Sequence, residues 1–368
     1  MGLCWSRRPG PAVSVFVRTI AVLVVAGGCG RLGYDPLELD GAIARDAGLE
    51  RDAGIERDAG VDRDGGDTER DAGIPPDGGE RDAGIEPDGG TPPVGGCVPW
   101  QPGFRFDVVG PITELNGPDL DSEPSLSLDG LTLRFTSTRD GVGSSVFSAD
   151  RASVDAPFGA PVLVAWASSS VTDGPLWVRA DGLEAIVSSN RSGGLGGFDL
   201  WGATRAAIDQ PFVVANLGGV NSALNEWDPF VTSDGLELWL SRRDLPSTTT
   251  TEILRSVRAD SSVAFGAPAV VPELAVATAS EGNATLDETR TTVVFMSDRP
   301  GGIGAMDIWY AMRAAPTEPF GTPALLPSVS SIGRDWDPHL RADGCELVFV
   351  RGEDPVDWEL YRAIYVAP

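Results

Sequence analysis

The feature that most constrains the fold of this chain is an internal repeat, which recurs five times between residues 104 and 368. Each copy contains an acidic turn, and the five turns are Asp129-Gly130, Asp181-Gly182, Asp234-Gly235, Asp287-Glu288 and Asp343-Gly344. They are spaced by 52, 53, 53 and 56 residues. Asp-Gly between two extended runs predicts a tight hairpin, because glycine adopts positive φ angles without a Cβ clash. A supersecondary unit of slightly more than 50 residues therefore repeats along the chain.

The order of signals within each copy predicts four short β-strands. The turn is followed by an alternating apolar strand and, in four copies, by a Ser-x-Arg motif such as Ser189 to Arg191. A third strand follows, most clearly at 199–205 and 307–313, and a turn such as Pro319-Phe320-Gly321 leads into a fourth. Helical signals are nearly absent. We therefore predict an all-β fold, a five-bladed β-propeller of four-stranded antiparallel blades, with six blades as the alternative.

The repeat resembles that of TolB-type propellers. The shared pattern is an acid before proline, a short run to Asp-Gly, a strand ending in Ser-x-Arg, and Asp-Leu/Ile-Trp. The copies that carry it are Asp228-Pro229, Asp234-Gly235, Ser297 to Arg299 and Asp307 to Trp309. The resemblance covers residues 104–368 and implies the propeller fold. It implies no particular ligand, because that family is used for many kinds of binding.

The two ends of the repeat region predict how the ring closes. The chain ends at Pro368, directly after the third strand of the fifth copy, while residues 106–113 resemble a fourth strand. We expect the segment near 106–115 to complete the last blade. Cys97 precedes this segment and Cys345 lies in the blade that it would complete, so a Cys97–Cys345 disulfide would fix the seam. The alternative is two free, buried thiols.

Residues 1–28 are typical of a bacterial export signal, with three arginines before a short apolar run at 20–26. The run ends in Ala26-Gly27-Gly28-Cys29, which resembles a lipobox whose cysteine is lipidated. The alternative is an ordinary signal peptide cut at a nearby small residue. Gly30, in place of the aspartate that retains lipoproteins at the inner membrane, favours anchoring at the outer membrane. We expect an exported lipoprotein attached through Cys29, on the periplasmic side or the cell surface.

Residues 29–96 are predicted to form a linker, and residues 97–368 the propeller domain. The linker repeats Arg-Asp-Ala-Gly and has no aromatic residue after Tyr34, so it cannot bury enough apolar surface to offset its ordering entropy. Alternating acids at Asp62, Asp64 and Asp67 raise the alternative of Ca²⁺ binding, but the EF-hand pattern is not met. We expect a solvated spacer and no cofactor.

The charge of the chain narrows the classes of partner. The formal net charge is −26, which disfavours nucleic acid and anionic lipid surfaces. His339 is the single histidine of the sequence, which excludes sites that need two imidazoles from this chain. We expect a monomer that contacts the membrane only through its lipid anchor.

The first strand of each blade lines the channel of a propeller, so acids there are candidate ligands for a metal or a cationic group. If the blades are equivalent, five acids gather at one end of the channel: Glu123, Asp173, Asp228, Glu281 and Asp337. The alternative is a structural role within the repeat. Three tryptophans near the same end are ligand candidates: Trp177, Trp227 and Trp336.

Two classes of function follow from this pattern. The first is a binding or scaffolding module for a protein or peptide partner, which we favour because the blades are alike and no catalytic residue stands out. The second is a carbohydrate-active propeller, in which carboxylates of different blades form an acid and nucleophile or base pair. Glu123, Asp228, Glu281 and Asp337 are its candidate residues.

Overall fold

The structure is a computed structural model that describes residues 96–141, 143–243, 250–352 and 357–368. The predicted export signal, Cys29 and the acids Asp62 to Asp67 lie outside these residues. The described part contains 20 β-strands and no helix, so it holds no helix long and apolar enough to span a membrane.

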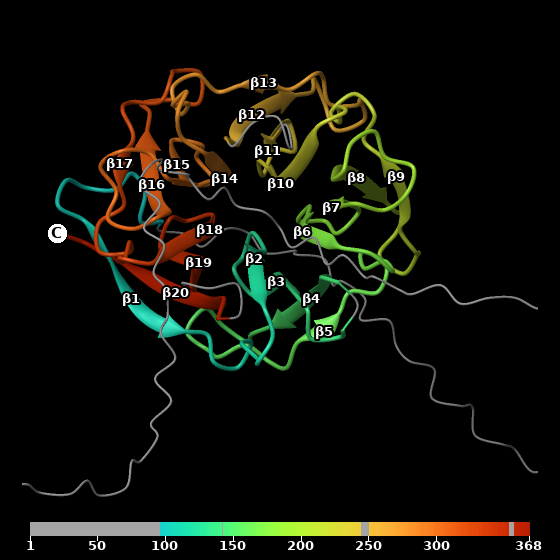
Figure 1. Cartoon of the computed structure of the whole chain (residues 1–368), viewed down its shortest axis with the longest axis horizontal. Helices are drawn as coiled ribbons and strands as arrows, with labels where there is room; N and C mark the ends of the chain where they lie inside the picture. Colours follow the sequence, from blue (N-terminus) through green and yellow to red (C-terminus); the bar gives the residue numbers. More distant parts are fainter. Residues whose placement is uncertain (1–95, 142, 244–249, 353–356) are drawn as a thin grey trace, which may run out of the picture. The chain divides into compact units, whose positions relative to one another are not determined.

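The strands form five four-stranded antiparallel sheets, arranged as blades around a central axis (Figure 1). The predicted five-bladed propeller is therefore confirmed, and the six-bladed alternative is wrong. We number the blades in chain order and list their strands from inside to outside. Blade 1 consists of β2 (Asp121–Leu126), β3 (Thr132–Ser137), β4 (Ser145–Asp150) and β5 (Val162–Leu163), and blade 2 of β6 (Asp173–Val178), β7 (Glu184–Ser189), β8 (Asp199–Thr204) and β9 (Val213–Asn216). Blade 3 consists of β10 (Asn225–Val231), β11 (Glu237–Arg243), β12 (Glu252–Val257) and β13 (Ala269–Val270).

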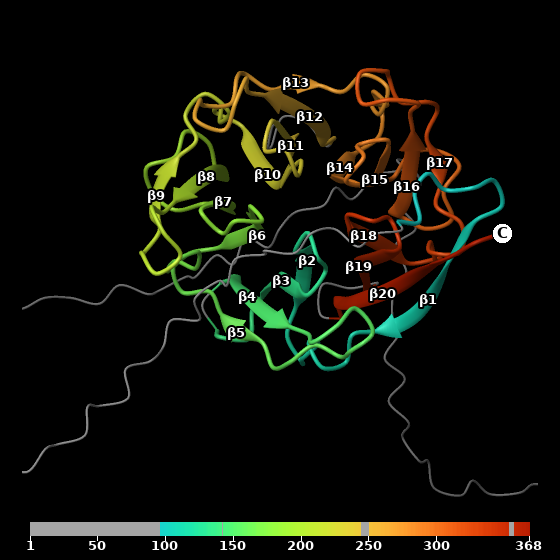
Figure 2. The ribbon, with the colours of Figure 1, turned by 180° about the vertical axis from the view of Figure 1, so that it is seen from behind.

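The last two blades differ in how their outer strand is supplied. Blade 4 is continuous in sequence, whereas the outer strand of blade 5 comes from the start of the domain. Blade 4 consists of β14 (Glu281–Leu286), β15 (Thr292–Ser297), β16 (Asp307–Met312) and β17 (Ala324–Leu325). Blade 5 consists of β18 (Arg334–Leu340), β19 (Glu346–Gly352), β20 (Glu359–Val366) and β1 (Arg105–Pro111). β1 lies beside β20 in both ribbon views (Figures 1 and 2), as the sequence predicts.

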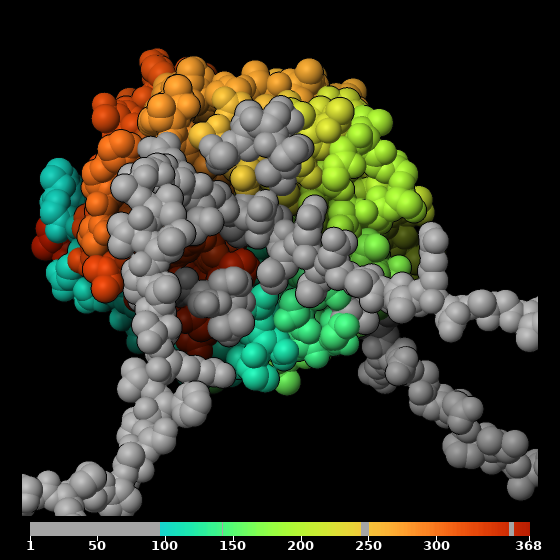
Figure 3. Space-filling model, viewed as in Figure 1, coloured from blue at the N-terminus to red at the C-terminus, as the bar shows by residue number. Residues whose placement is uncertain are grey.

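The apolar core lies between the blades rather than in the centre. Val146 and Leu176 pack together between blades 1 and 2, and Trp239 and Phe295 between blades 3 and 4. Alternating side chains of each sheet thus cover the neighbouring sheets, which is why a single blade could not fold alone. The space-filling view shows the blades packed in sequence order around the ring (Figure 3).

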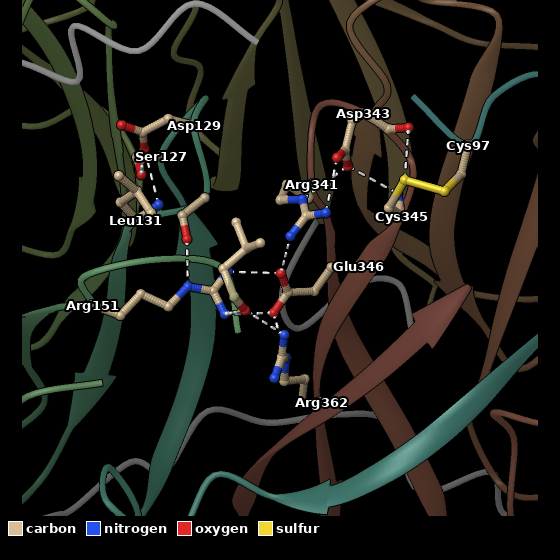
Figure 4. Close-up of polar contacts among 12 residues, drawn as sticks. Cys97, Ser127, Asp129, Leu131, Arg151, Arg341, Asp343, Cys345, Glu346 and Arg362 are labelled. Carbon is tan, nitrogen blue, oxygen red and sulfur yellow. Dashed lines mark hydrogen bonds and ion pairs between the residues drawn. A yellow bond between two sulfur atoms is a disulfide. The ribbon is translucent and has the colours of Figure 1, made fainter. Parts of the chain in front are cut away.

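The segment that closes the ring is held to the last blade by covalent and polar contacts. Cys97 and Cys345 form a disulfide, and the Cys97 amide donates to the Asp343 carbonyl at 2.7 Å. Trp100 donates its indole N–H to the Gly344 carbonyl at 3.0 Å. The segment that precedes β1 is therefore bound to the turn between β18 and β19 (Figure 4).

The turns between the first two strands have the predicted left-handed backbone, with one correction. Gly130, Gly182, Gly235 and Gly344 have φ between 66° and 73°. In blade 4 this place is taken by Arg290, with φ of 58°, and not by Glu288. Asp287-Glu288 therefore does not correspond to the Asp-Gly pairs of the other blades, as the sequence analysis assumed. It corresponds to the two residues that directly precede those pairs, such as Ser127-Leu128 in blade 1.

In four blades an arginine directly after the third strand bonds to the first turn, which lies at the same end of the blade. Arg151, Arg205, Arg258 and Arg313 each donate from Nε to a carbonyl of the first turn, over 2.6 to 2.7 Å. Each guanidinium also lies over the phenylalanine of the following turn, 4.2 to 4.6 Å from the ring centroid. The Pro-Phe-Gly-type turns of the repeat therefore supply a cation–π partner.

Candidate functional site

Each innermost strand has an acid at or next to its first residue, and this acid pairs with an arginine of the same blade. We number the positions of each innermost strand from this acid, so the first position is Asp121, Asp173, Glu226, Glu281 and Asp335. Each forms an ion pair with an arginine at or just after the end of the second strand, over 2.6 to 3.4 Å: Arg139, Arg191, Arg242, Arg299 and Arg351. These arginines also donate to a carbonyl of the incoming loop.

The Ser-x-Arg motif is therefore structural, and two of its members differ from the expected ones. In blade 3 the pairing residue is Arg242 and not Arg243, and in blade 5 Arg351 performs the same role without the serine. Asp173 and Glu281, which we expected at the channel, belong to this first position. Burial raises the pKa of Glu281 to about 7, although Arg299 opposes the shift.

The third position of the innermost strands faces the channel. It is occupied by Glu123, Pro175, Asp228, Asn283 and Asp337. The expected ring of five acids is thus a group of three acids with one amide. Asp228, Asn283 and Asp337 are buried, and Glu123 is partly exposed.

The third-position side chains reach from one blade to the next. The backbone N–H of Asn283 donates to Asp228 Oδ2 at 3.2 Å, and the side-chain Nδ2 of Asn283 donates to Asp337 Oδ1 at 3.3 Å. Asp337 Oδ2 in turn accepts from the Glu123 amide N–H at 3.3 Å. A chain of hydrogen bonds thus links blades 3, 4, 5 and 1 across the channel.

The backbone is strained at these residues. Glu123, Asp228, Asn283 and Asp337 have φ between 46° and 54°, the left-handed region that residues with a Cβ rarely adopt. The pairing register with the second strand shifts in each of these blades at the same point. Such bulges re-aim side chains, and backbone strain of this kind gathers at functional sites.

The three carboxyl groups compete for protons. Burial raises the pKa of Asp228 to about 6. Burial and then the charge of Asp228 raise the pKa of Asp337 to about 7. The pKa of Glu123 is well above its usual value because of burial, Asp337 and Asp228. At neutral pH the group therefore carries fewer than three negative charges.

The fifth position of the innermost strands forms the next layer of the channel, with the residues Ser125, Trp177, Phe230, Thr285 and His339. The rings of Phe230 and His339 meet edge to face at 6.0 Å. Burial, and then the positive charge of Arg134, lower the pKa of His339 to about 3. The imidazole is therefore neutral at physiological pH.

A pocket opens above this layer, at the mouth of the channel where the first turns lie. It contains roughly 560 Å³ of empty space, part of which is open solvent. We call it the channel-mouth pocket. Trp177, Phe230 and His339 line it from below, and one residue from each first turn forms its rim: Leu128, Ala180, Ser233, Glu288 and Ala342.

The predicted tryptophans have different places. Trp177 lines the channel-mouth pocket. Trp227 packs against Phe198 at 5.5 Å, and Trp336 against Trp358 at 4.4 Å, so both lie among other side chains rather than in the pocket.

Sequence reasoning missed Phe230 and Glu288 as pocket residues. Phe230 could have been found by counting to the fifth position from the acid that pairs with arginine. Among the described residues, no group of three or more His, Cys, Asp or Glu side chains is arranged to hold a metal ion.

Comparison with known proteins gives structural likenesses only. No family model matches the chain, and no curated protein matches it in sequence. The catalytic domain of a family-62 α-L-arabinofuranosidase of Coprinopsis cinerea is 12% identical with a TM-score of 0.47, over 72% of this chain and 97% of that one. A putative TolB of Agrobacterium tumefaciens is 16% identical with a TM-score of 0.42, over 68% and 78%.

A thermostable family-43 glycoside hydrolase is 11% identical with a TM-score of 0.46, over 68% of this chain and 90% of that one. Likenesses at this level carry no assignment of function. The function must be argued from the site.

Proposed function

We propose that the propeller is a binding module for a protein or peptide, and that the partner inserts a side chain or chain end into the channel-mouth pocket. The pocket is concave, apolar below and open to solvent, which are the usual properties of a binding site. The rest of the partner would then lie across the face formed by the first turns.

One observation carries this proposal: the blades differ where they face the pocket and agree where they hold the fold. The first position is an arginine-paired acid in all five blades. The fifth position is instead serine, tryptophan, phenylalanine, threonine and histidine. Closure of the ring alone does not require the fifth-position residues to differ between the blades. An asymmetric lining is what recognition of an asymmetric ligand requires.

We further propose that the module is anchored in the cell envelope by a lipid on Cys29, at the outer membrane. The lipobox-like Ala26 to Cys29 and the acidic linker support this. The Cys97–Cys345 disulfide supports an oxidising compartment. The domain begins beside Asp343, next to the rim residue Ala342, so the tether would reach the domain on the face that carries the pocket.

Site-specific photo-crosslinking tests the binding proposal. A photo-reactive amino acid in place of Leu128, at the pocket rim, should capture a partner, whereas one in place of Val213, exposed on the outer rim of blade 2, should not. The captured peptide, resynthesised, should bind the Trp177→Ala variant at least about tenfold more weakly than the wild type. Equal capture from both positions, or unchanged affinity in the variant, would refute the proposal.

The carbohydrate-active alternative is favoured by a different observation, the third-position carboxyl groups. Burial raises the pKa values of Asp228 and Asp337 to about 6 and about 7, and burial and then the charges of these two residues raise the pKa of the partly exposed Glu123. Glycosidases need carboxyl groups in different protonation states at one pH. A screen against aryl glycosides and polysaccharides tests it. Activity that is lost in both Glu123→Gln and Asp337→Asn would establish the alternative, and an inactive wild type would remove it.

A further inference from the structure

The rim of the channel-mouth pocket carries one carboxylate without a partner. Glu288 is partly buried and lines the pocket, while the equivalent rim residues are Leu128, Ala180, Ser233 and Ala342. Within the described part of the chain, no side chain donates a hydrogen bond or forms an ion pair to the Glu288 carboxylate. Burial, and then the charge of Asp287, raise its pKa, so the carboxylate lacks the stabilisation that a cation would supply.

The other charges at the pocket are already satisfied. Both carboxylate oxygens of Asp287 accept hydrogen bonds, from Thr289 and Thr292. Arg179 forms ion pairs with Asp181 at 2.8 Å and with Glu184 at 2.7 Å. Arg134, which lies near His339, is fully buried. Glu288 is therefore the charge at the pocket that a ligand can neutralise.

The apolar wall suits the body of the same ligand. Trp177 and Phe230 present aromatic surface below the rim, and Leu126, Leu286 and Leu340 add aliphatic surface. Aromatic faces attract cations as well as apolar groups. The neutral His339 adds no opposing charge.

We propose that the channel-mouth pocket binds a protonated amine carried on an apolar body, such as a lysine side chain or the amino terminus of a peptide, with Glu288 as the residue that recognises the charge. This inference rests on the proposed binding function and specifies its ligand. It also gives a role to Glu288, whose place in the other first turns is taken by uncharged residues. Glu288 precedes the left-handed turn residue Arg290 by two positions, as Leu128 precedes Gly130, so its side chain occupies the equivalent place at the rim.

Three probes of similar shape and different charge test this proposal on the full chain. They are 2-phenylethylammonium, 2-phenylethanol and 3-phenylpropanoate, and binding is measured by calorimetry or ligand-observed NMR at low ionic strength. The ammonium should bind about tenfold more tightly than the alcohol, and the propanoate more weakly still, because a hydrogen-bonded charge pair contributes more than a neutral contact. In the Glu288→Gln variant, the preference for the ammonium over the alcohol should disappear.

Glu318→Gln is the matched control, because Glu318 is exposed, lies outside the pocket, and is on the loop that Arg313 joins to the first turn of blade 4. It removes the same charge and should keep the preference. Trp177→Ala should weaken all three probes, and Trp177→Leu replaces it if the first variant does not fold. A preference that persists in Glu288→Gln, or that is lost equally in Glu318→Gln, would overturn the assignment to Glu288, and so would a wild type that does not bind the ammonium.

The two proposals fail in different ways. If the alcohol or the propanoate binds as tightly as the ammonium, and Trp177→Ala removes that binding, the ligand class is wrong while the pocket remains a binding site. If photo-crosslinking at Leu128 captures nothing, or if the captured peptide binds the Trp177→Ala variant as tightly as the wild type, the proposed binding function itself is wrong.

Discussion

Glu346 of the last blade and Arg151 of the first blade form an ion pair of 2.7 Å in which both side chains are fully buried. Glu346 also pairs with Arg341 at 2.5 Å and with Arg362 at 2.6 Å (Figure 4). Three guanidinium groups thus converge on one carboxylate at the place where the ring closes. The contact between the chain's first and last blades therefore includes a buried network of charges.

Replacing this carboxylate should destabilise the domain severely. Glu346→Gln leaves three guanidinium groups without their shared negative charge, and we expect a loss of about 3 to 5 kcal/mol in the free energy of unfolding. Asp107→Asn is the control, because Asp107 pairs with Arg105 on the surface; it should cost under about 1 kcal/mol. Denaturant unfolding measures both, and equal effects would contradict the structural role of Glu346.

The buried and exposed faces of the closing strand β1 should differ in how much a substitution destabilises the domain. Phe106 of β1 is fully buried, whereas Val109 of the same strand is 64% exposed. We expect Phe106→Ala to cost about 3 to 5 kcal/mol, and Val109→Ala less than about 0.5 kcal/mol. Deletion of residues 97–111 should open the ring and remove the cooperative thermal transition. A deletion variant that melts like the wild type would show that β1 does not close the propeller.

The disulfide should make stability depend on redox conditions. It joins residues 248 positions apart, and in the chain-entropy model loss of a long cross-link costs roughly 2 to 5 kcal/mol. We expect the melting temperature of the wild type to fall in reductant, and that of a Cys97→Ala, Cys345→Ala double variant to be low and insensitive to reductant. If the wild type melts at one temperature with and without verified reduction, the cross-link contributes nothing.

The blades could be predicted because the repeated residues hold the fold. Arg205 and Phe212 show the reason: the arginine reaches back to the first turn and the ring lies under its guanidinium, and the same pair recurs in blades 1, 3 and 4. A contact needed once per blade leaves its residues at a constant spacing. Spacing along the sequence therefore indicates strand number, strand order and the closing strand.

The channel could not be predicted in the same way, because acids occupy two positions of the innermost strand. Blades 1, 3 and 5 have an acid at both the first and third positions, while blades 2 and 4 have Pro175 and Asn283 at the third. Alignment on a single acid therefore placed Asp173 and Glu281 two residues out of register. The bulge after the first position also breaks the simple alternation from which side-chain direction is inferred.

The third-position carboxyl groups should make stability depend on pH in a direction opposite to that of ordinary surface acids. The pKa of Asp228 is raised to about 6 in the folded protein, so between its unfolded value near 3.8 and about 6 the folded state binds more protons than the unfolded state. The contribution of Asp228 to stability is therefore present at low pH and is lost as the pH rises through this window.

Asp228→Asn removes this titration while keeping an oxygen that can accept the Asn283 amide N–H. Relative to the wild type, the variant should gain stability as the pH rises from about 4 to about 6 and show a constant difference above, by on the order of 2 to 3 kcal/mol. Glu318→Gln, at an exposed carboxylate, should show no such pH-dependent difference. Urea unfolding of the three proteins at pH 4, 5, 6 and 8 measures these differences. A difference between Asp228→Asn and the wild type that is flat across this range, or that falls with rising pH, would mean that Asp228 is ionised in the folded channel and that the protons are held by Asp337 and Glu123 instead.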